Sequence, residues 1–209
     1  MLTALAVTVF AAPGQAAAHP FGDPQTVTIS ADAARPDTVH IRWKVGGLDD
    51  LTLLGISLGL LPRSRVMLDG AVFYQATDAT TVGPSPELTE YLLRQIGVTS
   101  AGKSCAGTVH PPTELAKSGI TLDFTCPAAV GKVTVAVRTL TDLNAAYQTL
   151  ATGPNGARAV YAAGHETHDW VLGQAGKSNH VVLAGVSLLV VVLLFLLVRR
   201  MQRAKRVTR

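Results

Sequence analysis

The pattern of apolar and polar residues divides the 209-residue chain into a long middle part and two apolar ends. Residues 181–198 read VVLAGVSLLVVVLLFLLV, without a charged residue or a proline. As a helix with a rise of about 1.5 Å per residue, this run is about 27 Å long, close to the roughly 30 Å hydrocarbon core of a bilayer. The run predicts a membrane-spanning helix. The alternative is a buried helix of a soluble domain, which is seldom apolar on all sides over this length.

Basic residues follow the apolar run directly, namely Arg199, Arg200, Arg203, Lys205, Arg206 and Arg209. Lys and Arg accumulate on the cytoplasmic side of membrane helices because their translocation is costly. We therefore expect residues 199–209 to form a cytoplasmic tail and the chain before Val181 to lie outside the cell membrane. Residues 173–180 form a short polar tether, and the lipid bilayer is a predicted partner of this single-pass protein.

The beginning of the chain has the pattern of a signal peptide. Residues 2–12 are apolar, and residues 16–18 are alanines, the small side chains that precede a signal-peptidase site. We expect residues 1–18 to be removed, so that the mature chain begins at His19. The alternative is an uncleaved N-terminal anchor, for which residues 2–12 are too short to span a bilayer comfortably.

Alternation of apolar and polar residues in the middle part predicts β-strands. Residues 25–30 and 39–45 flank a turn and are expected to form a hairpin with one buried and one solvent-exposed face. A second hairpin is predicted from residues 120–126 and 132–137, which residues 127–131 connect. Further strands are predicted at residues 103–109, 157–162 and 170–172.

Residues 51–61 and 86–96 instead have apolar side chains at helical spacing. Asp49 or Asp50 can cap the first helix, Ser85 is the expected cap of the second, and Gly97 is expected to end it.

The residues between the two helices predict a tight hairpin at Asp69-Gly70 and a linker at residues 77–84. Together, these elements predict a mainly β protein: an antiparallel β-sandwich with a helical insertion, plus one C-terminal transmembrane helix. Residues 19–172 are long enough for one extracytoplasmic domain.

Charge and cysteine content refine this picture. The net charge of +4 comes from the tail, because the part outside the membrane carries all 14 acidic residues and only the other 12 of the 18 basic ones. Nucleic-acid binding is therefore not expected. The only cysteines, Cys105 and Cys126, lie outside the membrane, where an oxidising compartment favours a disulfide. A metal-thiolate pair is the alternative, but no C-x-x-C spacing supports it.

His19 is the first candidate for chemistry. After cleavage, its α-amine and imidazole would form a compact nitrogen chelate that suits copper(II), and a second histidine would complete the site. The candidates for that second ligand are His40, His110, His165 and His168. His165 and His168 also belong to the segment GHETHD, a weak metal-site candidate whose alternative is a solvated turn.

Ser57 lies in GISLG, which matches the G-x-S-x-G nucleophile elbow of hydrolases, with Asp142 and His165 or His168 in triad order. An elbow requires a buried strand before the serine and a long helix after it. The leucines on both sides of Ser57 have helical spacing, so a helix with small residues packed against the sandwich is favoured.

Several short motifs resemble the extracytoplasmic domain of an uncharacterised family of secreted, membrane-anchored bacterial proteins. They are Ala18-His19-Pro20, Tyr91-Leu92-Leu93, Phe124-Thr125-Cys126-Pro127, Leu140-Thr141-Asp142-Leu143 and Trp170. More distantly, they are similar to the domain that precedes the permease in hydrogenase/urease accessory nickel-permease-like proteins. That resemblance implies a connection with nickel, cobalt or copper. One plain helix replaces the multi-spanning permease, so transport by this chain is not expected.

No constellation in the sequence meets the geometry that a catalyst requires. We therefore predict a non-catalytic binding or interaction module at the outer face of the membrane, with another membrane protein as a candidate partner. Metal handling through His19 is the alternative, and a serine hydrolase with Ser57 is a remote one.

Overall fold

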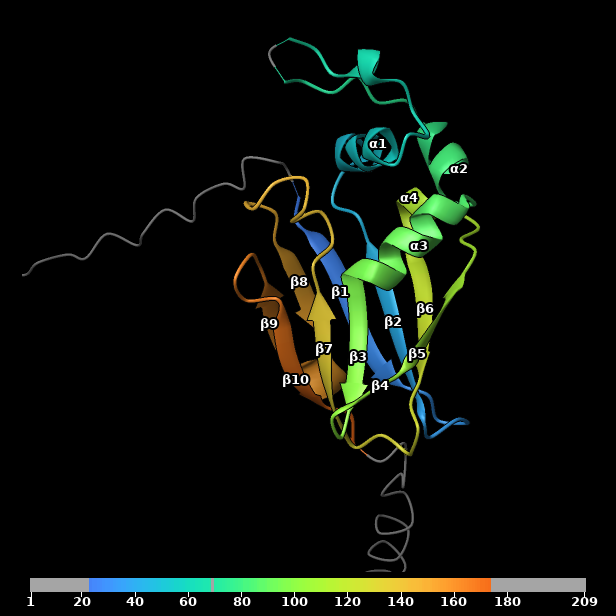
Figure 1. Ribbon diagram of the computed structural model, residues 1–209, viewed down its shortest axis with the longest axis vertical. Helices are drawn as coiled ribbons and strands as arrows, with labels where there is room; N and C mark the ends of the chain where they lie inside the picture. Colours follow the sequence, from blue (N-terminus) through green and yellow to red (C-terminus); the bar gives the residue numbers. More distant parts are fainter. Residues whose placement is uncertain (1–22, 69, 174–209) are drawn as a thin grey trace, which may run out of the picture.

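Two β-sheets packed face to face form the body of the protein (Figure 1). The computed structural model describes residues 23–68 and 70–173. The six-stranded sheet has the order β5-β6-β2-β1-β8-β9, and the four-stranded sheet has the order β10-β7-β3-β4. The strands are β1 (Gln25–Ala31), β2 (Thr38–Lys44), β3 (Ile96–Ser100), β4 (Lys103–Ser104), β5 (Ala106–His110), β6 (Ile120–Thr125), β7 (Lys132–Val137), β8 (Thr149–Thr152), β9 (Arg158–Tyr161) and β10 (Thr167–Val171).

The predicted mainly β fold is confirmed, and so is the first hairpin. β1 and β2 pair antiparallel, with Val27 opposite Trp43. The sheets are not purely antiparallel, however, because β1 also pairs with β8 in parallel. The six-stranded sheet is therefore mixed. A period-two pattern shows which face of a strand is buried, but it carries no information on the direction of a neighbouring strand.

One core lies between the sheets. Val27, Ile41 and Trp43 of the six-stranded sheet and Val98 and Val135 of the four-stranded sheet are all almost completely buried in it. The apolar positions of both sheets thus face each other, and their removal from water supplies the main driving force for folding.

Trp170 links the two sheets directly. Its indole Nε1 on β10 donates a hydrogen bond to the hydroxyl of Tyr161 on β9 at 2.8 Å. Gly153 packs so closely against this ring that a Cβ atom there would lie 2.2 Å from it, so only glycine fits.

The predicted helical insertion lies between β2 and β3, at one end of the sandwich (Figure 1). It contains α1 (Leu48–Ser57), the 3₁₀ turn η1 (Arg63–Arg65), α2 (Asp78–Val82) and α3 (Pro86–Gln95). Two shorter elements lie elsewhere, α4 (Leu115–Ser118) before β6 and the 3₁₀ turn η2 (Pro154–Gly156) before β9. The predicted cap of α3 is confirmed, since the Ser85 side chain accepts a hydrogen bond from the Leu88 N–H at 3.1 Å.

Other details of the insertion differ from the sequence prediction. Gly47 occupies the N-cap of α1, while Asp49 and Asp50 lie in its first turn. Residues 77–84 are not a linker, because they contain α2, whose first residue Asp78 is buried. Gly97 does not end α3: the helix ends at Gln95, and the chain passes directly into β3.

The second predicted hairpin is wrong, although both of its strands exist. β6 pairs with β2 and β5, whereas β7 pairs with β3 and β10, so the two strands belong to different sheets. The inner face of each sheet of a sandwich is apolar, and both strands therefore alternate in the same way whether or not they pair with each other. The connection crosses between the sheets, where the Val130 N–H donates to the Pro36 carbonyl and the Leu172 N–H donates to the Gly131 carbonyl.

The disulfide between Cys105 and Cys126 is confirmed. Cys105 does not lie within one strand of residues 103–109 but between β4 and β5, where the chain passes from the four-stranded to the six-stranded sheet. Cys126 follows β6, where the chain leaves for β7. The bond therefore joins two crossings between the sheets.

The predicted signal peptide, most of the predicted tether, the predicted spanning helix and the basic tail lie outside the described residues, as does His19. Among residues 23–68 and 70–173, no helix combines the length and the apolar character needed to cross a bilayer. The described chain begins next to Gly46, just before α1, and it ends after β10 at the opposite end of the sandwich (Figure 1).

Candidate functional site

An arm projects from the surface of the described part of the chain. The arm comprises residues 63–74, of which all but residue 69 are described. It stands out beyond α1 and α2 at the end of the sandwich that carries the insertion (Figure 1). The expected hairpin is reduced to a single antiparallel bridge between Val66 and Val72. At its end, the chain makes a tight turn, in which the Gly70 N–H donates a hydrogen bond to the Met67 carbonyl at 3.0 Å.

Large apolar side chains of the arm face solvent. Met67 is 59% exposed, Phe73 63% and Tyr74 53%, and Leu68 is fully exposed. Single exposed apolar residues are common on protein surfaces, whereas several on one projection are unusual, and they make the arm a candidate interaction site.

The root of the arm is held by a buried ion pair. Arg65 Nη1 donates to both oxygens of the Asp78 carboxylate, at 2.6 and 2.7 Å, and the Asp78 side chain is only 2% exposed. The same carboxylate accepts a hydrogen bond from the Thr52 hydroxyl of α1 at 2.7 Å and one from the Gln75 N–H at 2.9 Å. The arm is therefore fixed to α1 and α2, while its tip stays in solvent.

These donors determine the charge of Asp78. Burial alone would raise the pKa of the Asp78 carboxyl. The hydrogen bonds from the Gln75 N–H, Thr52 and Arg65 outweigh burial and lower this pKa below its ordinary value. The carboxylate is thus ionised at neutral pH, as the ion pair requires.

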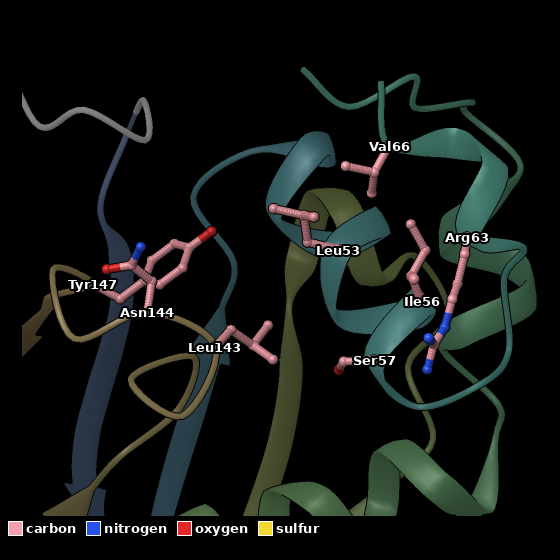
Figure 2. Close-up of a pocket in the computed structure, with 8 residues that line it drawn as sticks. All are labelled: Leu53, Ile56, Ser57, Arg63, Val66, Leu143, Asn144 and Tyr147. Carbon is pink, nitrogen blue, oxygen red and sulfur yellow. The ribbon is translucent and has the colours of Figure 1, made fainter. Parts of the chain in front are cut away.

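A pocket of about 500 Å³ lies beside the root of the arm (Figure 2). Its walls come from α1, from the arm and from the loop between β7 and β8; they are Leu53, Ile56, Ser57, Arg63, Val66, Leu143, Asn144 and Tyr147. The loop is held in place because the Tyr147 hydroxyl donates to Asp50 Oδ1 of α1 at 2.6 Å. Burial, together with the neighbouring Asp50 carboxylate, raises the pKa of Tyr147, so the hydroxyl stays protonated.

Ser57 lines this pocket as the last residue of α1, and its hydroxyl donates to the Leu54 carbonyl of the same helix at 2.7 Å. No strand runs into Ser57, so the G-x-S-x-G match is not a nucleophile elbow. Asp142 accepts instead from the Tyr91 hydroxyl at 2.9 Å. The helical interpretation of GISLG is confirmed for Gly55 to Ser57, which end α1. Gly55 packs within the insertion and not against the sandwich, since a Cβ atom there would lie 2.7 Å from Leu61 and from Val82 of α2.

A second polar cluster, the sheet-face network, lies on the solvent-facing side of the six-stranded sheet. His40 on β2 lies opposite Asp123 on β6, and its two ring nitrogens lie 2.5 Å from Asp123 Oδ1 and 3.1 Å from Asp32 Oδ2. Arg35 donates to both carboxylates, at 2.6 Å to Asp32 and 2.8 Å to Asp123. His110 Nε2 lies 3.1 Å from Asp123 Oδ2.

Every carboxylate oxygen of this network has a partner, because Asp32 Oδ1 also accepts from the N–H groups of Ala34 and Arg35. The arrangement fastens the turn between β1 and β2 onto β6. Burial alone would raise the pKa of the Asp123 carboxyl, but the hydrogen bonds from Arg35 and the two histidines outweigh burial and lower this pKa to about 2.

The lowered pKa of Asp123 predicts a loss of stability in acid. A carboxyl group with a lower pKa in the folded than in the unfolded chain stabilises the fold above its unfolded pKa of about 3.9, and it loses this contribution as the pH falls toward the folded value. We expect Asp123→Asn to lower the free energy of unfolding by about 2 kcal/mol at pH 7 and by much less at pH 2. Urea unfolding at several pH values measures both.

Glu114→Gln is the matched control for that prediction, because Glu114 is 60% exposed and, within residues 23–68 and 70–173, forms an ion pair only with the surface Lys117. Its effect is expected to stay below about 0.5 kcal/mol at every pH. Equal effects of the two substitutions at pH 7 would show that the network does not stabilise the fold.

The predicted metal ligands lie in several places. His165 is in the tight turn between β9 and β10, and His168 is exposed on β10 with its ring 5.0 Å from that of Trp170. His40 and His110 belong to the sheet-face network. Among the described residues, no three metal-ligating side chains are arranged to hold an ion. His19 lies outside these residues, so the copper or nickel/cobalt site with His19, His165 and His168 stays a prediction.

The sequence pattern did not predict the arm or the ion pair that holds its root. Asp69-Gly70 indicated a turn there, but nothing in the local pattern showed that the flanking apolar residues would have no sheet to pack on. Asp78 stood in a Thr/Pro/Gly-rich stretch that predicted a linker. Its pairing with Arg65, 13 residues earlier, is visible only in the fold.

The fold and these surfaces define a β-sandwich with a locked apolar arm beside a pocket. The chain matches no protein-family model, no curated protein and no solved structure.

Proposed function

We propose that this protein is a membrane-anchored, extracytoplasmic interaction module without catalytic activity, and that its arm is the element that docks a partner. The exposed apolar tip on a locked root carries this proposal. Ordering a side chain on binding costs free energy, and a projection that is already held in place reduces that cost.

The position of the arm favours a protein as its partner and argues against the lipid bilayer. The described chain ends after β10, at the end of the sandwich opposite the arm (Figure 1). If residues 181–198 anchor the protein, the arm points away from its own membrane. Its apolar residues would then meet the extracytoplasmic part of another protein, which is the kind of partner that the sequence predicts.

The test uses the full chain, purified from membranes in mild detergent, and measures the mass of the assembly by light scattering. We expect an assembly larger than one chain, and we expect the double substitution Leu68→Ser and Phe73→Ser to reduce it to a single chain. The thermal stability should stay unchanged, because both side chains are exposed.

Leu150→Ser is the matched control, since Leu150 is 42% exposed on β8 and belongs neither to the arm nor to the lining of the pocket. This variant should keep the larger assembly. A single chain in every variant, or an assembly that the arm substitutions leave intact, would refute the docking role of the arm.

A further inference from the structure

We infer that the arm docks on a second copy of this chain, so that the tip of each arm fills the pocket beside the root of the other. This inference rests on the proposed docking role of the arm and names its partner. Three observations on the structure carry it: the chemistry of tip and pocket, their shared position, and the area that each contact can bury.

The tip and the pocket match in chemistry. The tip presents Met67 and Leu68, and the pocket walls include the apolar side chains of Leu53, Ile56 and Leu143. A pocket of about 500 Å³ has the size of sites that take drug-sized ligands, so it has room for the end of a tight turn.

The position of both elements favours a symmetric pair. Val66 belongs to the arm and also lines the pocket, so the arm and the pocket open at the same end of the sandwich. An arm that enters a partner's pocket therefore brings its own pocket next to the partner's arm. This self-complementary arrangement is what a two-fold axis requires.

The buried area also favours reciprocal contact. An aromatic side chain buries about 150–250 Å², and each arm exposes Phe73 and Tyr74 in addition to the two tip residues. One arm in a foreign groove buries only a few hundred Å² on each side. Two arms and two pockets bury twice as much, which reaches the roughly 1,000 Å² that a specific interface needs.

The test is a disulfide between two differently tagged full-length chains produced in the same cells. One chain carries Leu68→Cys in the tip, and the other carries Ser57→Cys in the pocket wall. Both native cysteines are already joined to each other, so the introduced thiols have no competing native partner among the described residues. A disulfide requires Cβ atoms about 3.5–4.5 Å apart, and it therefore reports direct contact of tip and pocket.

We expect a covalent dimer that contains both tags, at several times the amount found when the second chain carries Leu150→Cys instead. An amount no greater than this control overturns the inference. If the larger assembly contains a different protein and the two tags stay unlinked, the second copy is the wrong partner while the docking role of the arm stands. If the arm substitutions also leave every assembly intact, both proposals fail.

Discussion

Replacing Arg65 with Met is expected to lower the free energy of unfolding by about 3 kcal/mol at pH 7. The substitution keeps much of the side-chain volume but removes the positive charge from a carboxylate that is only 2% exposed. Removing one partner of a buried ion pair costs about 3–5 kcal/mol because the other charge is left without compensation. We expect the lower end of this range, since Thr52 and the Gln75 N–H still donate to Asp78.

The effect of this substitution should depend on pH. The pKa of Asp78 is lowered in the folded protein, so its ion pair stabilises the fold above the unfolded pKa of about 3.9 and is lost as the pH falls through the folded value. The difference between the wild type and Arg65→Met should therefore be largest at neutral pH and shrink below about pH 4. Urea unfolding followed by tryptophan fluorescence can measure it, because Trp43 and Trp170 are both buried.

Arg63→Met is the matched control, two residues away on the same arm. Arg63 is exposed and makes no ion pair with another residue of the described chain, so this substitution should change the free energy of unfolding by no more than about 0.5 kcal/mol. If the two substitutions had the same effect, the arm would not be locked by its ion pair, and its tip could not be considered preorganised for docking.

Most strands of this protein could be predicted from sequence, although β3 and β8 were missed, but the pairing of β1 with β2 was the only pairing predicted correctly. The alternation in residues 120–126 and 132–137 reports one buried face for each strand, and both buried faces exist. Whether these two strands pair with each other or lie in different sheets depends on contacts with residues distant in the sequence. One of these is the bond from the Cys126 N–H to the Asp37 carbonyl, which holds the end of β6 beside the turn between β1 and β2.

The candidate site shows the same limit. His40 was already among the possible metal ligands, and the alternation around Trp43 placed it on the solvent-exposed face of its strand. Its partner Asp123 is 83 residues away and comes opposite it only because β6 pairs with β2. Charged side chains carry a local signal of exposure, whereas their pairing depends on the topology of the sheet.

The arm could not be predicted from the local sequence pattern because its apolar residues predict burial. An apolar residue in a sequence predicts burial, and Met67, Leu68 and Phe73 would all be expected in a core. In the fold, this segment leaves the sandwich, and α1 and α2 fill the space beneath it. The exposure of these apolar residues therefore distinguishes the arm from the core, and it is visible only in the folded structure.

Removing the disulfide is expected to destabilise the protein by about 3 kcal/mol. The bond between Cys105 and Cys126 closes a loop of 21 residues, and most of its contribution comes from the lower conformational entropy of the unfolded chain. The double substitution Cys105→Ser and Cys126→Ser removes this restriction. Its midpoint of urea unfolding should fall, while the folded protein keeps its strand content by circular dichroism.

Reduction of the wild-type protein is the control that separates the covalent bond from the packing of the side chains. Cys126 is only 4% exposed, so the serine variant also places a hydroxyl in an apolar environment, whereas reduction keeps both sulfur atoms. If the bond acts through the unfolded chain, the reduced wild type should lose nearly as much stability as the double variant. A reduced protein as stable as the oxidised one would instead assign the effect of the double variant to packing. The disulfide would then add no stability, because the packing of the two sheets already holds the segments around Cys105 and Cys126 together.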